Sequence, residues 1–496
     1  MRSSLKDHTS ATERTVSTVG LVVLAVVLAL SAVWMDRLHY DAAVGAVVLV
    51  AIVVISLPVL RRLASRDDDQ RMFMILATAL IAKMAFSLVR YFVLAKVYGW
   101  VGDAGTYDRD GWALAQAIRS GSPLPAIASV ADEVGTGRIV QLTGFIYVVI
   151  GRSLYGGFFI YAWMAFWGLV LIIRGCRWGF PEVDQRRLAI LVLFFPSLLF
   201  WPSSVGKDAV MILLIGLVAY GAGRLLGPSP NLLGLIPFIV GLGGMLLIRP
   251  HVGLMAVLAL LVSMGFSVLG GGRRVASTGS GRRLFVRVAA LVVLVVGAAT
   301  AASQTAQFFV ERSNGSTSTT EALEMTVDRT QMGGSRFDPV IVRTPADIPA
   351  ATLSVLYRPF LWEASNFGNA IAAGESILLF VLTIMSWKRL RRWPGTAWRR
   401  PFVVFASAYV FMFVIAFSNI ANAGILARQR TQAIPFFLLL LAIPSDRWWR
   451  RNAKAAASAG GEGHGADLLG SPAATSDVAA RIDRSVSPVA FGERME

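Results

Sequence analysis

Long apolar runs recur along almost the whole chain and constrain its fold more than any other feature. Examples are Val19 to Val33 and Met72 to Ala82, and short breaks that carry arginine separate such runs. About 20 apolar residues span the hydrocarbon core of a bilayer as an α-helix. Transmembrane β-strands instead alternate polar and apolar residues, and the run Leu21 to Leu28 does not alternate. The sequence therefore predicts an all-α, polytopic helical membrane protein.

The composition excludes an ordinary soluble enzyme. The 496 residues are 55% hydrophobic and 16% charged, whereas about 25% of a soluble globular chain is charged. The formal net charge of +17 would indicate nucleic-acid binding in a soluble protein. Here the basic residues fall in short loops between apolar runs, which is typical of membrane orientation, and no nucleic-acid partner is expected. The single cysteine, Cys176, cannot form an internal disulfide.

The distribution of charge predicts the topology. About twelve transmembrane helices are expected, at residues 17–35, 41–60, 72–98, 155–173, 187–201, 208–225, 231–249, 252–270, 284–302, 371–387, 401–418 and 429–444. Arginine and lysine concentrate in alternate loops, so the positive-inside rule places both the N- and C-termini in the cytoplasm. The apolar run 139–150 is too short to cross the bilayer and is expected to form an interfacial or re-entrant helix.

These spans divide the chain into five parts. They are a cytoplasmic N-terminus with two extra N-terminal membrane helices (1–71), a membrane core with an outer loop at 99–154 (72–302), an extracytoplasmic loop (303–370), C-terminal membrane helices (371–451) and a cytoplasmic tail (452–496). The tail is rich in Ala, Gly and Ser and buries too little apolar surface to order itself, so it is expected to be disordered.

Polar residues near the membrane collect in five segments, all on the predicted outer side. These are 102–110, 195–208, 249–251, 357–375 and 419–430. A charged group at the edge of a bilayer must be solvated, paired or used in function. Arginine and lysine bind phosphate oxygens, and a desolvated carboxylate can act as a general base toward a hydroxyl. The five segments therefore favour a single outer pocket suited to phosphate chemistry.

Several of these motifs resemble those of bacterial GT-C-type membrane glycosyltransferases and related polysaccharide polymerases. The motifs are Gly-Asp-Ala-x-x-Tyr at Gly102 to Tyr107, Pro-Ser-x-x-Phe-Trp-x-Ser-Ser-x-x-Lys-Asp at Pro196 to Asp208, Arg-Pro-Phe-x-x-Glu at Arg358 to Glu363, and a late outer arginine pair. The resemblance implies that an acidic residue of the first outer loop is the catalytic base, which maps onto Asp103. It also implies a polyprenyl-phosphate sugar as the donor.

The expected function is transfer of a sugar or glycan from a polyprenyl-(pyro)phosphate-linked donor at the extracytoplasmic face of the bacterial cytoplasmic membrane, in cell-envelope polysaccharide or glycolipid synthesis. The expected partners are that donor, a glycan or lipid acceptor, and membrane lipids. Candidate catalytic residues are Asp103, Asp208 and Glu363, candidate ligands of the donor phosphate are Lys207, Arg249, Arg428 and Arg430, and supporting residues are Tyr107, Arg358 and His251. No cofactor is expected, and nothing in the sequence supports a divalent metal.

Each motif also has a structural interpretation. Asp103 is equally suited to cap the helix that follows it. The alternatives for the others are a local ion pair for Lys207 and Asp208, headgroup anchors for Arg249, Arg428 and Arg430, a loop-fixing pair for Arg358 and Glu363, and an interfacial structural role for His251. Asp108-Arg109-Asp110 matches a metal-binding Asp-x-Asp pattern, but residues two apart on a helix do not face the same way, so a solvated surface is expected rather than a metal site.

A lipid-linked glycan flippase or another multi-pass transporter is the alternative function. Lys83 and Arg90 favour it, because they lie seven residues apart on one face of an expected span, where charges are costly. The span interiors lack matching carboxylates for a proton relay, and no Walker-type loop indicates ATP-driven transport. Formation of a glycosidic bond distinguishes the enzyme from the transporter.

Overall fold

The computed structural model describes residues 40–65, 70–100, 102–121, 125, 127–128, 130, 135–270, 296–307, 335–364 and 367–445. Within these residues the regular structure is helical, apart from one isolated antiparallel bridge between Arg336 and Asn422. The all-α prediction is thus confirmed for the described part of the chain. The chain divides into two compact units, 1–443 and 444–496, and all the helices below belong to the first.

Six of the described helices are long and apolar enough to cross a membrane. They are α2 (Tyr40–Ser65), α3 (Gln70–Lys96), α7 (Leu154–Gly179), α10 (Lys207–Leu226), α12 (Pro250–Gly270) and α16 (Phe367–Met385). Shorter apolar helices are α6 (Thr136–Ile150), α11 (Leu235–Ile248), which the 3-10 turn η1 (Leu232–Gly234) precedes, and α19 (Pro401–Phe417). The expected span 17–35, most of 284–302 and the expected disordered tail lie outside the described residues.

Two of the twelve expected spans are interrupted helices. The expected span 187–201 consists of α8 (Gln185–Leu193) and α9 (Pro196–Phe200), and the span 429–444 contains only α21 (Ile434–Leu441), which follows α20 (Ala423–Arg430). Proline explains the break between α8 and α9. It lacks a backbone N–H and disfavours helical conformation in the residue before it, and Phe195 before Pro196 is extended. Between α20 and α21 the chain instead forms turns at residues 431–433, and Pro435 is the second residue of α21.

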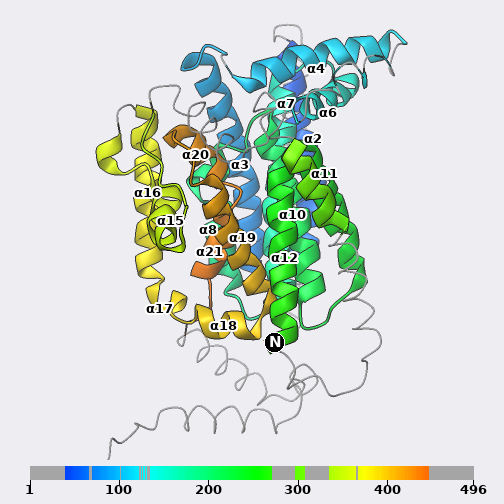
Figure 1. Cartoon of the computed structure of the whole chain (residues 1–496). Coiled ribbons are helices and arrows are strands. Elements are labelled where there is room, and N and C mark those ends of the chain that lie inside the picture. Colours follow the sequence, from blue (N-terminus) through cyan, green and yellow to red (C-terminus); the bar gives the residue numbers. More distant parts are fainter. Residues whose placement is uncertain are drawn as a thin grey trace, which may run out of the picture. The chain divides into compact units, whose positions relative to one another are not determined.

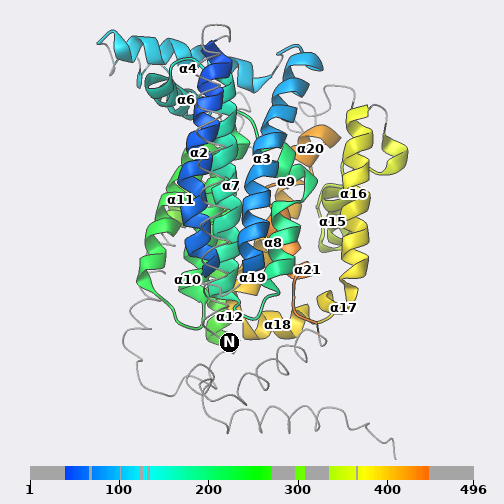
Figure 2. The ribbon, with the colours of Figure 1, turned by 180° about the vertical axis from the view of Figure 1, so that it is seen from behind.

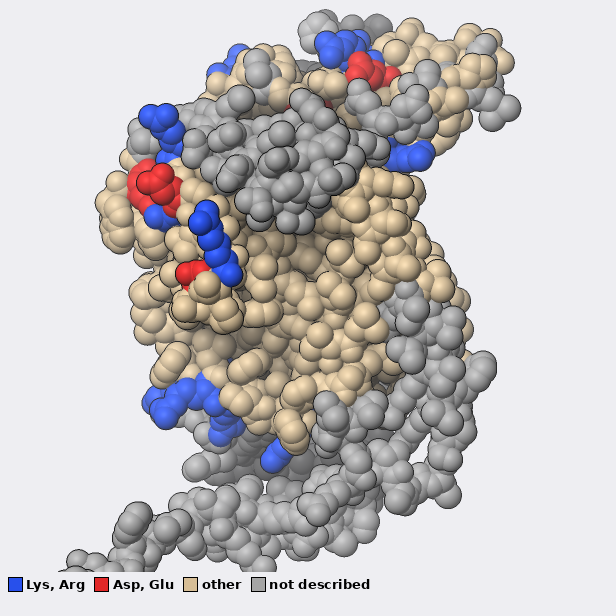
Figure 3. Space-filling view, in the orientation of Figure 1, with Lys and Arg blue, Asp and Glu red and all other residues tan. Residues whose placement is uncertain are grey.

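The remaining elements lie at the two ends of the membrane helices. Figures 1 and 2 show α4 (Asp103–Arg119) and α6 across one end, and α17 (Trp387–Leu390) and α18 (Trp393–Arg399) across the other. Residues 335–364 contain η2 (Pro345–Asp347), α15 (Ile348–Tyr357) and η3 (Leu361–Glu363), and α15 packs against α16 and α19. Figure 3 shows one face of the molecule. A broad uncharged surface occupies the middle of that face, and charged side chains gather toward its ends. This distribution matches a protein embedded in a bilayer.

Helices α7 and α10 approach closely along two pairs of glycines. A Cβ on Gly168 would lie 2.3 Å from the carbonyl oxygen of Ile212, and one on Gly216 would lie 2.3 Å from that of Gly168. Seven residues further along each helix, a Cβ on Gly223 would lie 2.1 Å from the carbonyl oxygen of Gly175. Small residues let helix backbones touch, which provides van der Waals packing where lipid removes the hydrophobic driving force.

Replacing Gly175 by alanine is expected to lower the unfolding temperature clearly. The added Cβ would lie 2.4 Å from the carbonyl oxygen of Ala219, so the two backbones must separate, and overpacking of this kind costs about 1–3 kcal/mol. Gly243→Ala is the matched control, because a Cβ there meets nothing within 4 Å. Thermal unfolding of the detergent-purified variants, followed by tryptophan fluorescence, measures the difference. Equal unfolding temperatures for the two variants would contradict the prediction.

Lys83 and Arg90 of α3 both contact α9, and Arg90 also contacts the residue that follows it. Lys83 is buried, and its Nζ donates a hydrogen bond to the carbonyl oxygen of Leu198 at 2.6 Å. The guanidinium of Arg90 lies over the rings of Phe200 and Trp201, 4.9 and 5.0 Å from their centroids. These contacts stabilise the interrupted helix, because a buried backbone carbonyl needs a donor and an aromatic face attracts a cation. Both charges therefore have a structural role.

Candidate functional site

Four charged side chains from separate parts of the chain form one connected network, which we name the Asp208 cluster. Arg249 Nη2 donates to Asp208 Oδ1 at 2.9 Å, and Arg428 Nε donates to Asp208 Oδ2. Arg428 Nη2 also donates to Asp103 Oδ2 at 3.1 Å. Asp103 begins α4, Asp208 lies in the first turn of α10, Arg249 separates α11 from α12, and Arg428 lies on α20. One arginine thus bridges two carboxylates.

Glycines place both carboxylates at the starts of their helices. Gly102 and Gly206 are the N-cap residues of α4 and α10, with φ of 148° and 158°, values that favour glycine. A carboxylate in the first turn interacts favourably with the positive end of the helix dipole. Gly102, and not Asp103, is the N-cap residue of α4, and the Asp103 carboxylate accepts a hydrogen bond from Arg428. The capping interpretation of Asp103 is wrong.

The two carboxylates differ in their access to solvent. Asp208 is 5% exposed and lies between two guanidiniums, whereas the side chain of Asp103 is 55% exposed. A buried carboxylate is tolerated only when opposite charges and hydrogen bonds compensate its lost hydration. Asp208 is therefore the internal counter-ion of the arginines. Asp103 is the carboxylate that an incoming molecule can reach.

The electrostatic environment sets the protonation of two neighbouring side chains. The charge of Asp208, and more weakly that of Asp103, raises the pKa of Arg428, so this arginine stays charged. Burial raises the pKa of Tyr107, which keeps its hydroxyl protonated. Tyr107 lies four residues after Asp103 and hence on the same side of α4. Its ring approaches Gly206, where a Cβ would lie 3.7 Å from Cε2 of the tyrosine.

Two further cations border the Asp208 cluster. Lys207 Nζ donates to Thr136 Oγ1, at the start of α6, at 2.9 Å. Arg90 interacts electrostatically with Arg428, Asp208 and Asp103. The sequence connected Arg90 only with transport, although its position near the outer end of the expected span before Asp103 was a signal for the site. Among the described residues, Arg90, Arg249 and Arg428 carry one positive charge more than Asp103 and Asp208 balance.

Some arginine N–H groups at the site are unsatisfied. Arg90 Nε and Arg249 Nη1 are buried and have no hydrogen-bond acceptor among the described residues. An unsatisfied buried donor costs about 1–3 kcal/mol, and an excess of buried positive charge adds to that cost. The site therefore suits an anion with several acceptor oxygens, which arginine binds with well-defined geometry.

The structure does not bring Arg430 into the Asp208 cluster. Its side chain is fully buried and donates to the carbonyl oxygens of Leu356 at 2.6 Å and Arg358 at 3.0 Å. It also pairs with Glu375 at 3.2 Å. Its guanidinium thus connects α20 to α15 and α16, and it is not placed to bind the phosphate expected from the sequence.

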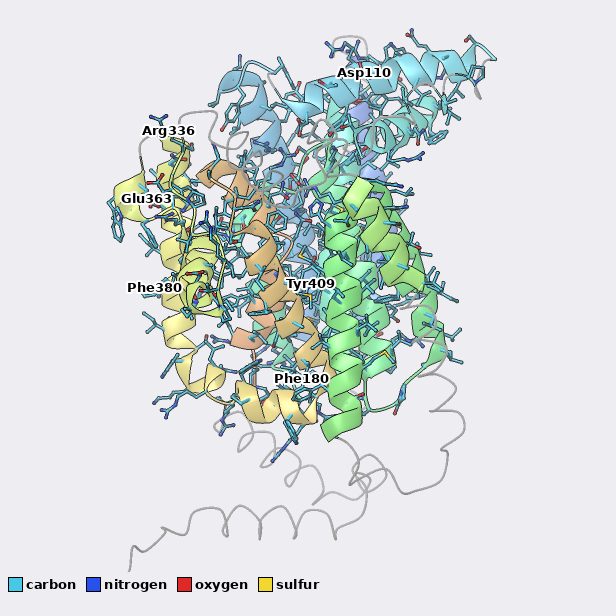
Figure 4. The ribbon with its side chains drawn as sticks, in the orientation of Figure 1. Asp110, Phe180, Arg336, Glu363, Phe380 and Tyr409 are labelled. Atoms are coloured by element: carbon cyan, nitrogen blue, oxygen red, sulfur yellow. The ribbon has the colours of Figure 1, made fainter. Side chains whose placement is uncertain are left out.

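Glu363 and Arg358 likewise lie apart from the cluster, and Figure 4 shows Glu363 and Asp110 on opposite sides of the view. The two side chains form an ion pair at 3.0 Å, and Glu363 Oε2 accepts from the backbone N–H of Phe360 at 2.9 Å. Arg358 also donates to the carbonyl oxygen of Asp338 at 2.7 Å. These contacts favour the loop-fixing interpretation over a catalytic role for Glu363.

His251 lies in the first turn of α12, and its ring centroid is 5.9 Å from that of Phe417. This aromatic contact agrees with a structural role. Among the residues that the structure describes, no group of three or more His, Cys, Asp or Glu side chains is placed to hold a metal ion.

The solvated surface expected for Asp108 is wrong. Asp108 is 8% exposed and accepts hydrogen bonds from Tyr147 Oη at 2.7 Å and Arg152 Nη2 at 2.8 Å. The side chain of Asp110 is 43% exposed and pairs with that of Arg109, which is 73% exposed, as expected. Asp108 is therefore a buried carboxylate, on a different side of α4 from Asp103.

No protein-family model matches this chain, and neither a curated protein nor a solved structure matches it. The resemblance to GT-C-type glycosyltransferases thus comes from the sequence motifs alone. Because function depends on the site rather than on the fold, the chemistry of the Asp208 cluster is the basis on which the function is inferred.

Proposed function

We propose that this chain is a membrane glycosyltransferase that transfers a sugar or glycan from a polyprenyl-(pyro)phosphate-linked donor. The observation that carries the proposal is the Asp208 cluster with Arg90 beside it, in which Arg90 Nε and Arg249 Nη1 have no hydrogen-bond acceptor among the described residues. A phosphate or pyrophosphate supplies both the negative charge and the acceptor oxygens that these groups need.

In the proposed reaction, Asp103 takes the proton of an acceptor hydroxyl, because it is the accessible carboxylate of the cluster. The acceptor oxygen bonds to the anomeric carbon of the donor sugar, and the bond from that carbon to the phosphate oxygen breaks. The electron pair stays on the phosphate, where Arg249 and Arg428 stabilise the developing charge. Asp208 holds these two arginines in position. The step as proposed uses no cofactor.

The charge distribution supports an extracytoplasmic site. The segment that contains α17 and α18 lies at the opposite end of the membrane helices from α4. It contains Lys388, Arg389, Arg391, Arg392, Arg399 and Arg400 and no carboxylate. By the positive-inside rule this end faces the cytoplasm, and the Asp208 cluster then faces outward. We place the protein in a bacterial cytoplasmic membrane, in synthesis of a cell-envelope polysaccharide or glycolipid.

Transfer of radiolabelled sugar from polyprenyl-phosphate and polyprenyl-pyrophosphate donors, by purified protein in liposomes, tests the proposal. The wild type is expected to form a glycosidic bond, and Arg428→Ala is expected to reduce the rate by about 10²–10³, the effect of removing one preorganised charge-stabilising donor. Arg109→Ala is the matched control, because Arg109 is exposed on α4 outside the cluster. Movement of labelled lipid across the bilayer without bond formation from any donor would overturn the proposal in favour of a flippase.

A further inference from the structure

We propose that Asp108 is a positioning residue, which together with Tyr147 and Arg152 sets the orientation of α4 so that Asp103 reaches Arg428, and that the start of α2 anchors this connection. The inference rests on the proposed function for the role of Asp103 as the base. The contacts themselves do not depend on that role.

Two hydrogen bonds hold the Asp108 carboxylate in place. Tyr147 Oη donates to Oδ1 at 2.7 Å and Arg152 Nη2 donates to Oδ2 at 2.8 Å, so each carboxylate oxygen has its own donor. Asp108 follows Asp103 by five residues, which rotates it by about 140° around the helix axis. The two carboxylates therefore lie on different sides of α4. Holding Asp108 on one side limits rotation of the helix and with it the direction of Asp103.

Helix α4 is attached to α6 along the length of α4. A Cβ on Gly111 would lie 2.8 Å from Cβ of Thr143, so the two helices are in close contact. Near the other end of α4, Arg119 Nη2 donates to the carbonyl oxygens of Tyr147 at 3.0 Å and Val148 at 2.8 Å. The position of α4 thus depends on that of α6, and on where α6 joins α7.

Helix α2 holds the junction between α6 and α7 by contacts on both sides of Arg152. Before it, Tyr40 Oη donates to the carbonyl oxygen of Ile150 at 2.9 Å. After it, Asp41 Oδ1 accepts from Ser153 Oγ at 2.8 Å and from the backbone N–H of Tyr155 at 3.0 Å.

Asp41 in this way provides α7 with a capping carboxylate from another helix. Arg152 is consequently fixed relative to α7. Because Arg152 donates a hydrogen bond to Asp108, the position of α4 is also fixed relative to α7. Helix α2, which the expected enzyme layout treats as extra, acquires a role as an anchor. Among the described contacts, Asp41, Arg152, Tyr147 and Asp108 do not reach Asp208, Arg249 or Arg428, so a change at Asp108 alters the position of the base and leaves the ion pairs of Asp208 in place.

Kinetics of Asp108→Asn and Asp110→Asn test the inference. Asp110 is two residues further along α4, but it is exposed and pairs only with exposed Arg109 among the described contacts. Asp108→Asn is expected to lower kcat by about 10-fold to 10²-fold, because a small misplacement of a reacting group is enough for such a loss. The KM for the donor is expected to stay within about twofold, since the arginines keep their counter-ion. Asp110→Asn is expected to change neither constant.

A distance measurement provides a readout that does not need activity. Spin labels on Gln116→Cys of α4 and Lys96→Cys of α3 lie on exposed positions, and the single natural cysteine, Cys176, is buried. Double electron–electron resonance is expected to give a narrow distance distribution in the doubly labelled protein and in its Asp110→Asn variant. The distribution is expected to be broadened or shifted in the Asp108→Asn variant. Tyr147→Phe, which removes one of the two donors and keeps the ring, is expected to give an intermediate result and serves if Asp108→Asn does not fold.

The outcomes separate this inference from the proposed function. An unchanged distance distribution in Asp108→Asn and in Tyr147→Phe overturns the positioning role, whatever happens to the rate. A rise in KM at unchanged kcat also overturns it, because that result would place Asp108 in donor binding. If the wild type forms no glycosidic bond while Asp108→Asn still broadens the distribution, the positioning of α4 stands and the glycosyltransferase proposal fails.

Discussion

Replacing Asp103 by asparagine is expected to lower the rate of sugar transfer by about 10²–10⁴, the usual contribution of a general base. The amide cannot take a proton from the acceptor hydroxyl, but it has nearly the same shape and still accepts a hydrogen bond from Arg428. Because the side chain is 55% exposed, the unfolding temperature is expected to stay close to that of the wild type. The liposome assay gives the rate, and thermal unfolding confirms that the variant is folded.

Asp110→Asn is the matched control for Asp103→Asn, since it removes an exposed carboxylate from the same helix. It is expected to retain full activity. Wild-type rates in Asp103→Asn would exclude this carboxylate as the base and leave it a partner of Arg428 alone.

Replacing Asp208 by alanine is expected to have the largest effect on stability. Asp208 is buried between Arg249 and Arg428, so its removal leaves two guanidiniums without their shared counter-ion. Removing one partner of a buried ion pair costs about 3–5 kcal/mol. We expect a strong fall in the yield of monodisperse protein on size exclusion and in the unfolding temperature. Asp103→Ala, which removes the exposed partner of the same arginine, is expected to be much less destabilised.

A double variant tests whether charge, rather than packing, explains the loss. Asp208→Asn with Arg249→Gln removes one charge of each sign, and Arg428 keeps Asp103 as its partner. The double variant is expected to unfold at a higher temperature than Asp208→Asn alone, because coupled residues are not additive. A double variant less stable than the sum of the two single changes would refute the counter-ion role.

The long apolar runs predicted most of the membrane helices and their approximate ends. The expected span 41–60 is α2 (Tyr40–Ser65), and the expected span 208–225 is α10 (Lys207–Leu226). The same pattern did not predict the break between α8 and α9. The residues on both sides of Pro196 are apolar, and a continuous helix and an interrupted one have the same apolar composition there. Hydropathy reports which residues avoid water, whereas an interrupted helix depends on donors elsewhere in the fold, such as Lys83.

The candidate site was predicted in part for a similar reason. Residue type and topology grouped Asp103, Lys207, Asp208, Arg249 and Arg428 on one side of the membrane helices, and the structure places them around one network. The sequence treated Arg428 and Arg430 as equivalent. They are two residues apart on α20 and so point to nearly opposite sides of the helix, about 160° apart. Only Arg428 reaches Asp208, whereas Arg430 pairs with Glu375.

The same rotation separates buried Asp108 from exposed Asp110 on α4. The sequence by itself determined the helical fold class, the apolar segments and the types of charged residue at their ends, because these follow from local hydrophobicity and from the cost of charge near a bilayer. Only the tertiary structure decided which carboxylate each arginine binds and which carboxylate remains accessible. Those outcomes depend on how far each helix is rotated about its axis and on what packs against it, and residues distant in sequence set both.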